Sequence, residues 1–199
     1  MKHRSHGFTL AELMIVLALA AAILAIGSPS FNDFRANNRL TGVANDFLGA
    51  IQVARTEAIK RQVSASICPS DDGTSCSTTG SFRGWIAFVD GDDDCVRVTS
   101  DNTEPLLRVE TPIDSDRAKP IYEVSKGVCI SFGSNGFRQT IAGKGTADRT
   151  IFCDARGLDN QKGTNQSAAR GIEITPTGRA RVTRVKDEIG GWSLPCSSS

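Results

Sequence analysis

The chain has 199 residues and a formal net charge of +1 at pH 7, from 23 basic and 22 acidic residues. This balance excludes a globally basic protein, so any affinity for nucleic acid must come from a local patch. With 39% hydrophobic and 23% charged residues, the composition is typical of a folded domain and excludes a disordered tail.

The first element in chain order is an apolar helix near the N-terminus. No charged residue occurs from Leu13 to Asn32, a length that is enough to cross a membrane as a helix. Lys2 and Arg4 precede this run, and positive residues favour the cytoplasmic side. An uncleaved membrane anchor is one interpretation. It leaves Glu12 near the start of the run, where a carboxylate without a partner is costly.

The stretch GFTLAELMIVLALAAAILAIGSPSF supports a second interpretation, because it resembles the type IV pilin signature. The resemblance implies that a prepilin peptidase cleaves after Gly7, so that residues 1–7 are a leader and Phe8 becomes the methylated N-terminus. Residues 8–30 are then the transmembrane half of the helix. The resemblance also implies that Glu12 meets the terminal amine of a neighbouring subunit in the filament, which supplies its partner charge.

The helix is expected to continue as an amphipathic half over residues 31–62. Apolar residues recur there at spacings of three and four, which gives the helix one apolar side. That side contains Phe31, Phe34, Leu40, Val43, Phe47, Leu48, Ile51, Ala54, Ala58 and Ile59. We expect it to cover a sheet formed by residues 63–199. The predicted fold class is therefore α+β, with a long N-terminal helix packed on an antiparallel β-sheet in a C-terminal periplasmic domain.

Short strands separated by turn residues are predicted over the rest of the chain. They cover residues 63–68, 85–89, 106–109, 128–132, 150–153, 171–174 and 179–185. Stretches rich in glycine and serine at 77–81, 133–136 and 157–167 are predicted to be loops.

Six cysteines follow the apolar helix, on the side of the membrane opposite the basic leader. They are Cys68, Cys76, Cys95, Cys129, Cys153 and Cys196. Disulfides are expected in the oxidising periplasm, and six cysteines allow fifteen pairings, among which the sequence does not choose. The pairing that we favour joins Cys68 to Cys76 across a tight loop and Cys153 to Cys196 near the C-terminus, leaving Cys95 with Cys129. A structural zinc site is the alternative, although the chain has no CxxC motif.

Both histidines of the chain, His3 and His6, fall in the expected leader. A mature chain that starts at Phe8 therefore has no Ser-His-Asp or Cys-His pair, and no histidine for zinc. We expect a protein that is not an enzyme and that holds no cofactor.

An acidic stretch after the strand at 85–89 has alternating aspartates, like the start of a calcium-binding loop. It reads Asp90-Gly91-Asp92-Asp93-Asp94. Cys95 stands where an EF-hand has its glycine, and Asp101 replaces the bidentate glutamate. A calcium site and a solvated acidic loop both remain open, and no residue is assigned as a metal ligand.

The globular part is similar to the FimT/GspH-type minor pilins and pseudopilins. The similarity is carried, in order, by ICPSDDGTSC, GWIAFVD, LLRV, ISFGSNG, IFCDARG and GIEITPTGRARVTR. It implies a low-abundance subunit that starts or caps a filament, with other major and minor pilins as partners. FimT-like members also bind DNA during natural transformation through a Gly-Arg-x-Arg motif. In this chain the matching residues are Gly178-Arg179-Ala180-Arg181.

The residues around this motif are compatible with binding to phosphates. Thr175-Pro176-Thr177-Gly178 has the composition of a hairpin turn, so Arg179 and Arg181 should project from one face of the following strand while Ala180 and Val182 face the core. From residue 170 to 186 there are five basic residues, namely Arg170, Arg179, Arg181, Arg184 and Lys186, against the single acid Glu173.

Two features limit this patch. Strict alternation places Arg184 and Lys186 on the inner face, so a bulge, a strand end or a strong twist must free them. No aromatic residue lies between the arginines, so stacking on bases is not expected. Binding should be to the backbone of double-stranded DNA without sequence preference, with about four phosphates neutralised.

Three functions therefore remain open. The first is a minor pilin, at the pilus tip, that binds extracellular double-stranded DNA for uptake in natural transformation. The second is a minor pilin that primes pilus assembly without binding DNA, with these arginines as an ordinary hairpin surface. The third is a GspH-like pseudopilin of type II secretion. In each case the expected location is a single pass through the inner membrane with a periplasmic C-terminal domain, followed for a pilin by the extracellular pilus.

Overall fold

The computed structural model describes most of the chain. The described residues are 8–77, 84–100, 103–110, 121–124, 129–143, 147–154, 156–158, 164–192, 194 and 196, without the side chains of 25–30 and 121–124. The expected leader 1–7, with the cleavage residue Gly7, lies outside them, as do parts of the expected loops at 77–81 and 157–167 and the first residue of the expected strand at 128–132. The chain divides into two compact units, Met1–Asn38 and Arg39–Ser199.

One long helix, α1, runs through Leu10–Arg61. Within the part of the chain that the structure describes, no helix combines the length and the apolar character that crossing a membrane requires. The transmembrane half expected at 8–30 includes residues 25–30, whose side chains lie outside the description.

The second half of α1 has the expected apolar side, but this side begins later than predicted. Buried helix residues recur at spacings of three and four, and they are Leu40, Val43, Ala44, Phe47, Ala50, Ile51, Ala54 and Ala58. Phe31 and Phe34, which were expected on this side, are each 59% exposed. The prediction was wrong for these two residues because the helix part of the core starts at Leu40. It was also wrong for Ile59, which is 44% exposed near the end of the helix. The helix ends where Gln62 takes a positive φ of 58°.

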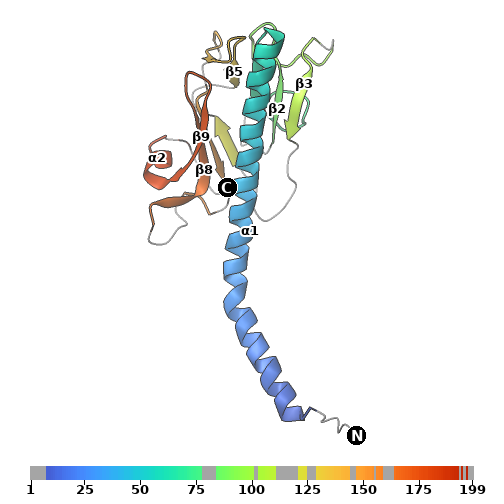
Figure 1. Ribbon diagram of the computed structural model, residues 1–199, viewed down its shortest axis with the longest axis vertical. Coiled ribbons are helices and arrows are strands. Elements are labelled where there is room, and N and C mark those ends of the chain that lie inside the picture. Colours follow the sequence, from blue (N-terminus) through green and yellow to red (C-terminus); the bar gives the residue numbers. More distant parts are fainter. Residues whose placement is uncertain are drawn as a thin grey trace, which may run out of the picture. The chain divides into compact units, whose positions relative to one another are not determined.

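Two antiparallel sheets follow the helix, where the sequence predicted one. The first has the order β3-β2-β1-β5-β6, with β1 (Ala65–Ser70), β2 (Gly84–Val89), β3 (Leu106–Glu110), β5 (Ile130–Phe132) and β6 (Arg138–Gln139). The second has the order β4-β7-β8-β9, with β4 (Ile121–Val124), β7 (Arg149–Cys153), β8 (Gln166–Ile174) and β9 (Ala180–Val185), and a short helix α2 (Lys186–Gly190) comes after β9 (Figure 1). The fold class is α+β, as predicted.

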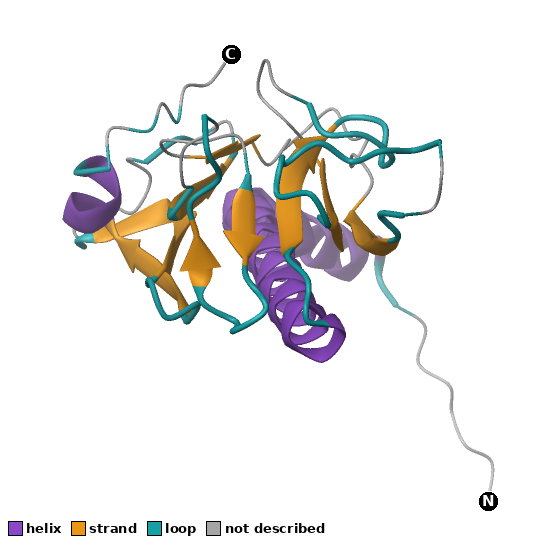
Figure 2. Cartoon of the chain, turned by 90° about the horizontal axis from the view of Figure 1, so that it is seen from above, coloured by secondary structure: helices purple, strands orange, loops and turns teal. Residues whose placement is uncertain are grey.

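The two sheets and the helix share one core. Phe47 of α1 packs edge-on against Trp85 of the first sheet, with ring centroids 5.2 Å apart. It also packs against Phe152 of the second sheet, with centroids 5.3 Å apart. Trp85 and Phe152 contact each other in turn, at 5.9 Å. This triad holds both sheets against the helix, which lies along their common side in Figure 2. The burial of these three aromatic side chains contributes a large part of the free energy that stabilises a domain of this size.

The outer faces of the sheets are closed by disulfides and smaller apolar clusters. The structure joins Cys68 to Cys76, Cys95 to Cys129 and Cys153 to Cys196. These are the three pairs favoured from the sequence. The first two pairs lie in a cluster with β2 residues on the first sheet. The third lies in a cluster with Ile189 of α2 on the second sheet, so the C-terminal segment is tied to β7.

Candidate nucleic-acid interface

The Gly-Arg-x-Arg motif lies on the hairpin formed by β8 and β9. We call residues 175–179 the arginine turn. The Thr175 amide donates to the Arg179 carbonyl at 2.9 Å, and the Gly178 amide donates to the Thr175 carbonyl at 2.9 Å. Gly178 has a φ of 78°, a conformation that suits glycine because it has no Cβ. The hairpin predicted from this stretch is therefore present.

Gly178 also forms a close contact between its own turn and a second turn. It is buried against the turn between β5 and β6, which we call the facing turn (residues 133–138). A Cβ at position 178 would lie 2.4 Å from the Gly136 carbonyl oxygen. The Arg55 Nε of α1 donates to this same carbonyl at 2.9 Å, and the Arg138 amide donates to the Pro176 carbonyl at 3.0 Å. The two turns are thus in direct contact.

Arg179 and Arg181 differ in their surroundings. Arg179 is exposed, and no carboxylate among the described residues pairs with its side chain. The Arg181 side chain is 54% exposed, and it forms ion pairs with two acids. Its guanidinium donates to Glu173 at 2.6 and 2.9 Å and also to Glu188 of α2. Arg179 is therefore the member of the motif that is available to an anion without breaking an existing pair.

Glu173 is the centre of this network. It lies opposite Arg149 on β7 and opposite Arg181 on β9, so three charged residues form a row across three strands. Arg149 donates to its other oxygen at 3.1 and 3.3 Å. The hydrogen bonds from Arg181 are the main cause that holds the pKa of Glu173 below its ordinary value. Burial opposes them, and the hydrogen bonds from Arg149 lower the pKa further. A phosphate that approaches Arg181 must therefore compete with two carboxylates.

Arg170 does not belong to the exposed patch, contrary to the sequence-based assignment. It is only 2% exposed, and its guanidinium donates to the Ala168 carbonyl at 2.5 Å and to the Thr41 hydroxyl of α1 at 3.1 Å. Burial, followed by the charges of Arg184 and Arg156, lowers the pKa of Arg170 to about 10. Arg170 is two residues before Ile172 on β8, and alternation places both on the face that packs against α1, in agreement with the hydrogen bond from Arg170 to Thr41.

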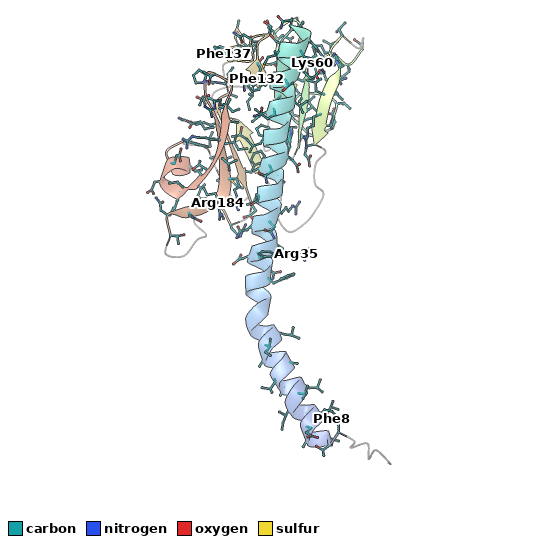
Figure 3. The ribbon with its side chains drawn as sticks, in the orientation of Figure 1. Phe8, Arg35, Lys60, Phe132, Phe137 and Arg184 are labelled. Atoms are coloured by element: carbon teal, nitrogen blue, oxygen red, sulfur yellow. A yellow bond between two sulfur atoms is a disulfide. The ribbon has the colours of Figure 1, made fainter. Side chains whose placement is uncertain are left out.

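Arg184 lies on the inner side, as alternation predicts, and Val182 departs from its prediction. Arg184 is half-buried, with its Nε enclosed and without a hydrogen-bond partner in the described part of the chain. Figure 3 shows it well away from Phe137, which lies on the facing turn. Lys186 is half-buried at the start of α2. Val182, expected in the core, is 39% exposed because β9 is the edge strand of its sheet.

The five predicted basic residues therefore do not form one patch. Arg179 lies exposed at the turn, Arg181 is paired with acids and Arg170 is buried. Arg184 lies towards the other end of β9, and Lys186 is half-buried at the start of α2 (Figure 3). Glu188 was missed as a partner of Arg181, because the five-residue helix that carries it has too little periodicity to be predicted. Arg138 was also missed, since nothing in its local sequence indicates that it contacts the arginine turn.

Near the N-terminus, Glu12 has a partner within the chain. Its carboxylate accepts from the Thr9 amide and hydroxyl, both at 3.0 Å, and the Glu12 amide donates back to the Thr9 hydroxyl at 3.3 Å. This is the reciprocal capping arrangement of a helix N-terminus. Phe8, the expected first mature residue, precedes it and is exposed.

The acidic loop is arranged differently from an EF-hand. Asp90 is buried and accepts from the Ser66 hydroxyl at 2.5 Å and the Asp94 amide at 3.1 Å. Its carboxylate lies within 4.8 Å of those of Asp92 and Glu104. Burial is the main cause that raises the pKa of Asp90 and of Glu104, with the charges of the neighbouring acids adding to it. Glu104 was not predicted because it lies beyond the loop in sequence.

Two regions of the chain match known family models. Residues 43–178 match the family model described as type II transport protein GspH, and residues 2–28 match the prokaryotic N-terminal methylation motif. Two curated fimbrial proteins of Pseudomonas aeruginosa are each 31% identical over 102 residues, which is 47% of this chain and 66% of each relative. The chain therefore matches slightly less than two thirds of their length.

Solved structures of the type IV minor pilin FimU from Pseudomonas aeruginosa are also similar. Two crystal forms cover 75% of this chain and 92% and 90% of their own, with 17% and 16% sequence identity. Their TM-scores are 0.45 and 0.41.

Proposed function

This chain belongs to the GspH family and carries the N-terminal methylation motif, and on that premise we propose that it is a minor type IV pilin that binds DNA. The proposed subunit lies in a pilus, at its tip, and binds extracellular double-stranded DNA without sequence preference for uptake in natural transformation. Its role is structural and ligand-binding, with no catalytic step.

The main support for DNA binding is the environment of the Arg179 side chain. It is an exposed guanidinium at the tip of a rigid hairpin, and no described carboxylate engages it. A guanidinium binds phosphate oxygens through two parallel hydrogen bonds. The turn that presents it is held in place by the contact between Gly178 and Gly136, so little ordering is needed on binding. Many copies or repeated contacts along one DNA molecule would add avidity to a weak single site.

The N-terminal part of α1 supports a role in assembly. Its large apolar side chains are exposed, among them Leu10, Leu13, Met14, Ile15, Val16, Leu17, Leu19, Ile23 and Leu24, together with Phe31 and Phe34. A continuous apolar surface of this kind requires a membrane or another protein to cover it. We propose both in succession: an inner-membrane anchor in the unassembled subunit, and contact with other major and minor pilins in the filament. Prepilin peptidase would cut after Gly7, and Glu12 would then lie near the new amine of Phe8 or of a neighbouring subunit.

A second function is favoured by two separate observations. The matched family is described as a type II transport protein, and Arg181 of the motif is engaged by Glu173 and Glu188. These agree with a pseudopilin of type II secretion, or with a minor pilin that primes assembly without DNA. In either case the hairpin arginines would be ordinary surface residues of the fold that do not bind DNA.

Fluorescence anisotropy with a labelled duplex tests the first function on the full chain in detergent. Binding should weaken with salt, since each neutralised phosphate contributes about −0.9 to the slope of log affinity against log salt. Arg179→Gln should reduce affinity and flatten the slope by about 0.9. Arg181→Gln should have a smaller effect because that arginine already has acidic partners. Arg108→Gln, which alters a paired arginine on β3 of the other sheet, is the control and should bind as the parent does.

Two results would overturn the proposal. One is the absence of any duplex binding by the parent chain at low salt. The other is an Arg179→Gln variant with the affinity and the salt slope of the parent. Either result would support the assembly or secretion role instead.

A further inference from the structure

A polar pocket lies beside the arginine turn. It has a volume of about 550 Å³, and its walls include Ser64, Asp93, Asn135, Phe137, Arg138 and Gln139. Three separate segments form it: the residues just after α1, the acidic loop, and the facing turn. A pocket of this size falls in the range used for small organic ligands.

The facing turn connects this pocket to the arginine turn. Arg138 forms part of the pocket wall, and its amide donates to the Pro176 carbonyl at 3.0 Å. Gly136 of the same turn touches Gly178, the residue before Arg179. A ligand that occupies the pocket therefore lies on the same end of the domain as the exposed Arg179. Figure 3 shows Phe137 at the same end of the domain as Lys60, which lies at the end of α1.

The walls offer a flat apolar surface together with directional polar groups. Phe137 is 51% exposed, so about half of its surface is accessible to a ligand. The Asn135 Oδ1 accepts the Phe137 amide at 2.9 Å, so its Nδ2 is the group that can donate to a ligand. Aromatic rings stack on flat ligands, while side-chain amides and carboxylates bind the polar edges of such ligands.

Two further residues in the pocket are polar. The Gln139 Nε2 lies 2.7 to 3.1 Å from three acceptors, on Ser64, Asp93 and Ser131, and of these Ser64 and Asp93 line the pocket. Arg138 is half-buried in the pocket wall and brings a positive charge to it.

We propose that this pocket takes an unpaired nucleobase of a DNA strand whose phosphates lie on the arginine turn. The base would stack on Phe137, its polar edge would meet Asn135 and Asp93, and Arg138 would bind a phosphate or a base acceptor. The proposal rests on the DNA-binding function above and adds a preference for single-stranded ends or gaps. The sequence could not indicate it, because Phe137 is some forty residues before Arg179 along the chain.

Three labelled probes test this on the full chain in detergent. They are a blunt duplex, the same duplex with a single-stranded run of thymines, and the same duplex with an equal run of abasic residues. The thymine and abasic extensions carry equal numbers of phosphates, so only a base-binding site distinguishes them. Stacking on one aromatic ring predicts that the thymine extension binds roughly tenfold more tightly than the abasic one.

The variants assign this difference to the pocket. Phe137→Ala should remove the preference for thymine over abasic extensions and leave the affinity for the blunt duplex unchanged. Phe137→Tyr should retain the preference because it keeps the ring. Phe34→Ala is the matched control, since Phe34 is a similarly exposed phenylalanine on α1, and it should behave as the parent.

The results separate the two proposals. Equal affinity of the parent for the thymine and abasic extensions, with binding to the blunt duplex intact, would overturn the pocket proposal alone. A Phe137→Ala variant that kept the preference for thymines would also overturn the pocket proposal and leave duplex binding standing. Failure of the parent to bind any of the three probes would overturn both the pocket and the DNA-binding function.

Discussion

Arg179 and Arg181 are two residues apart on one hairpin, and their neighbours give them different electrostatic roles. Arg181 faces Glu173 across the strand pair and reaches Glu188 on α2. Exposed ion pairs of this kind contribute little to stability, but they lower the positive potential that a phosphate would meet. The affinity of the hairpin for DNA should therefore depend on its acidic residues as much as on its arginines.

The substitution Glu173→Gln removes one negative charge and tests whether the acidic residues weaken DNA binding by the hairpin. The substitution releases Arg181 and Arg149 from their shared carboxylate, so affinity for duplex DNA should rise and the salt slope should steepen by about 0.9 for each phosphate gained. Asp46→Asn is the control, because it releases Arg108 on the other sheet and should leave binding unchanged. If Glu173→Gln bound no better than the parent, Arg181 would have no access to phosphates.

The same residue has a consequence for pH. The pKa of Glu173 lies below its ordinary value of 4.5, chiefly because of the hydrogen bonds from Arg181. A carboxyl with a lowered pKa in the folded state stabilises the fold above its ordinary pKa, and this contribution is lost as the pH falls through the lowered value. The Glu173→Gln variant should therefore lose less stability than the parent as the pH falls below about 4.5. The melting temperatures of both proteins, measured by thermal unfolding across this pH range, test this.

At the scale of elements, the sequence predicted the β8–β9 hairpin well. It did not predict the shortest elements, β6 and α2. The Thr-Pro-Thr-Gly turn and the alternation after it mark β8 and β9 clearly. β6 has only two residues and α2 only five, too few for a periodic pattern. Arg170 alternates with Ile172 on the buried face of β8, but which face of the strand meets α1 depends on distant parts of the chain and has no local signature.

Gly178→Ala measures how much the motif glycine contributes to the fold. The added Cβ would meet the Gly136 carbonyl at 2.4 Å, and the φ of 78° is unfavourable for alanine. Separation of the two turns should then lower the free energy of unfolding by about 2 to 4 kcal/mol.

Gly143→Ala is the matched control for that substitution. Gly143 has a similar φ of 73° but nothing within 4 Å of its added Cβ, so it should cost only about 1 kcal/mol from backbone strain. Urea unfolding of both variants gives the comparison. Equal costs would mean that the turn-to-turn contact contributes nothing, and that the glycine of the motif is required only for its backbone conformation.

At the scale of the whole molecule, the sequence indicated the class of fold and the position of the candidate site, but not how distant segments meet. The triad of Phe47, Trp85 and Phe152 draws on three elements, so a single amphipathic pattern could not reveal that two sheets share one helix. The pocket likewise needs three segments to come together. Such long-range contacts leave no periodic signal in a single chain, whereas the N-terminal motif and the hairpin are local and could be recognised.

The residues proposed for assembly and those proposed for DNA binding belong to different units of the chain. Its exposed apolar helix residues lie in the unit Met1–Asn38, whereas the arginine turn and the pocket lie in Arg39–Ser199. Because the assembly and DNA-binding residues belong to different units, a substitution at the arginine turn should spare filament formation.

DNA uptake by piliated cells that carry Arg179→Gln tests the central claim most directly. Uptake should fall while the variant subunit is still found in sheared pili in normal amount, because Arg179 supports no contact of the core. Parental uptake with the variant present in the pili would contradict the claim that this hairpin binds DNA, and would leave the protein as a filament subunit without that function.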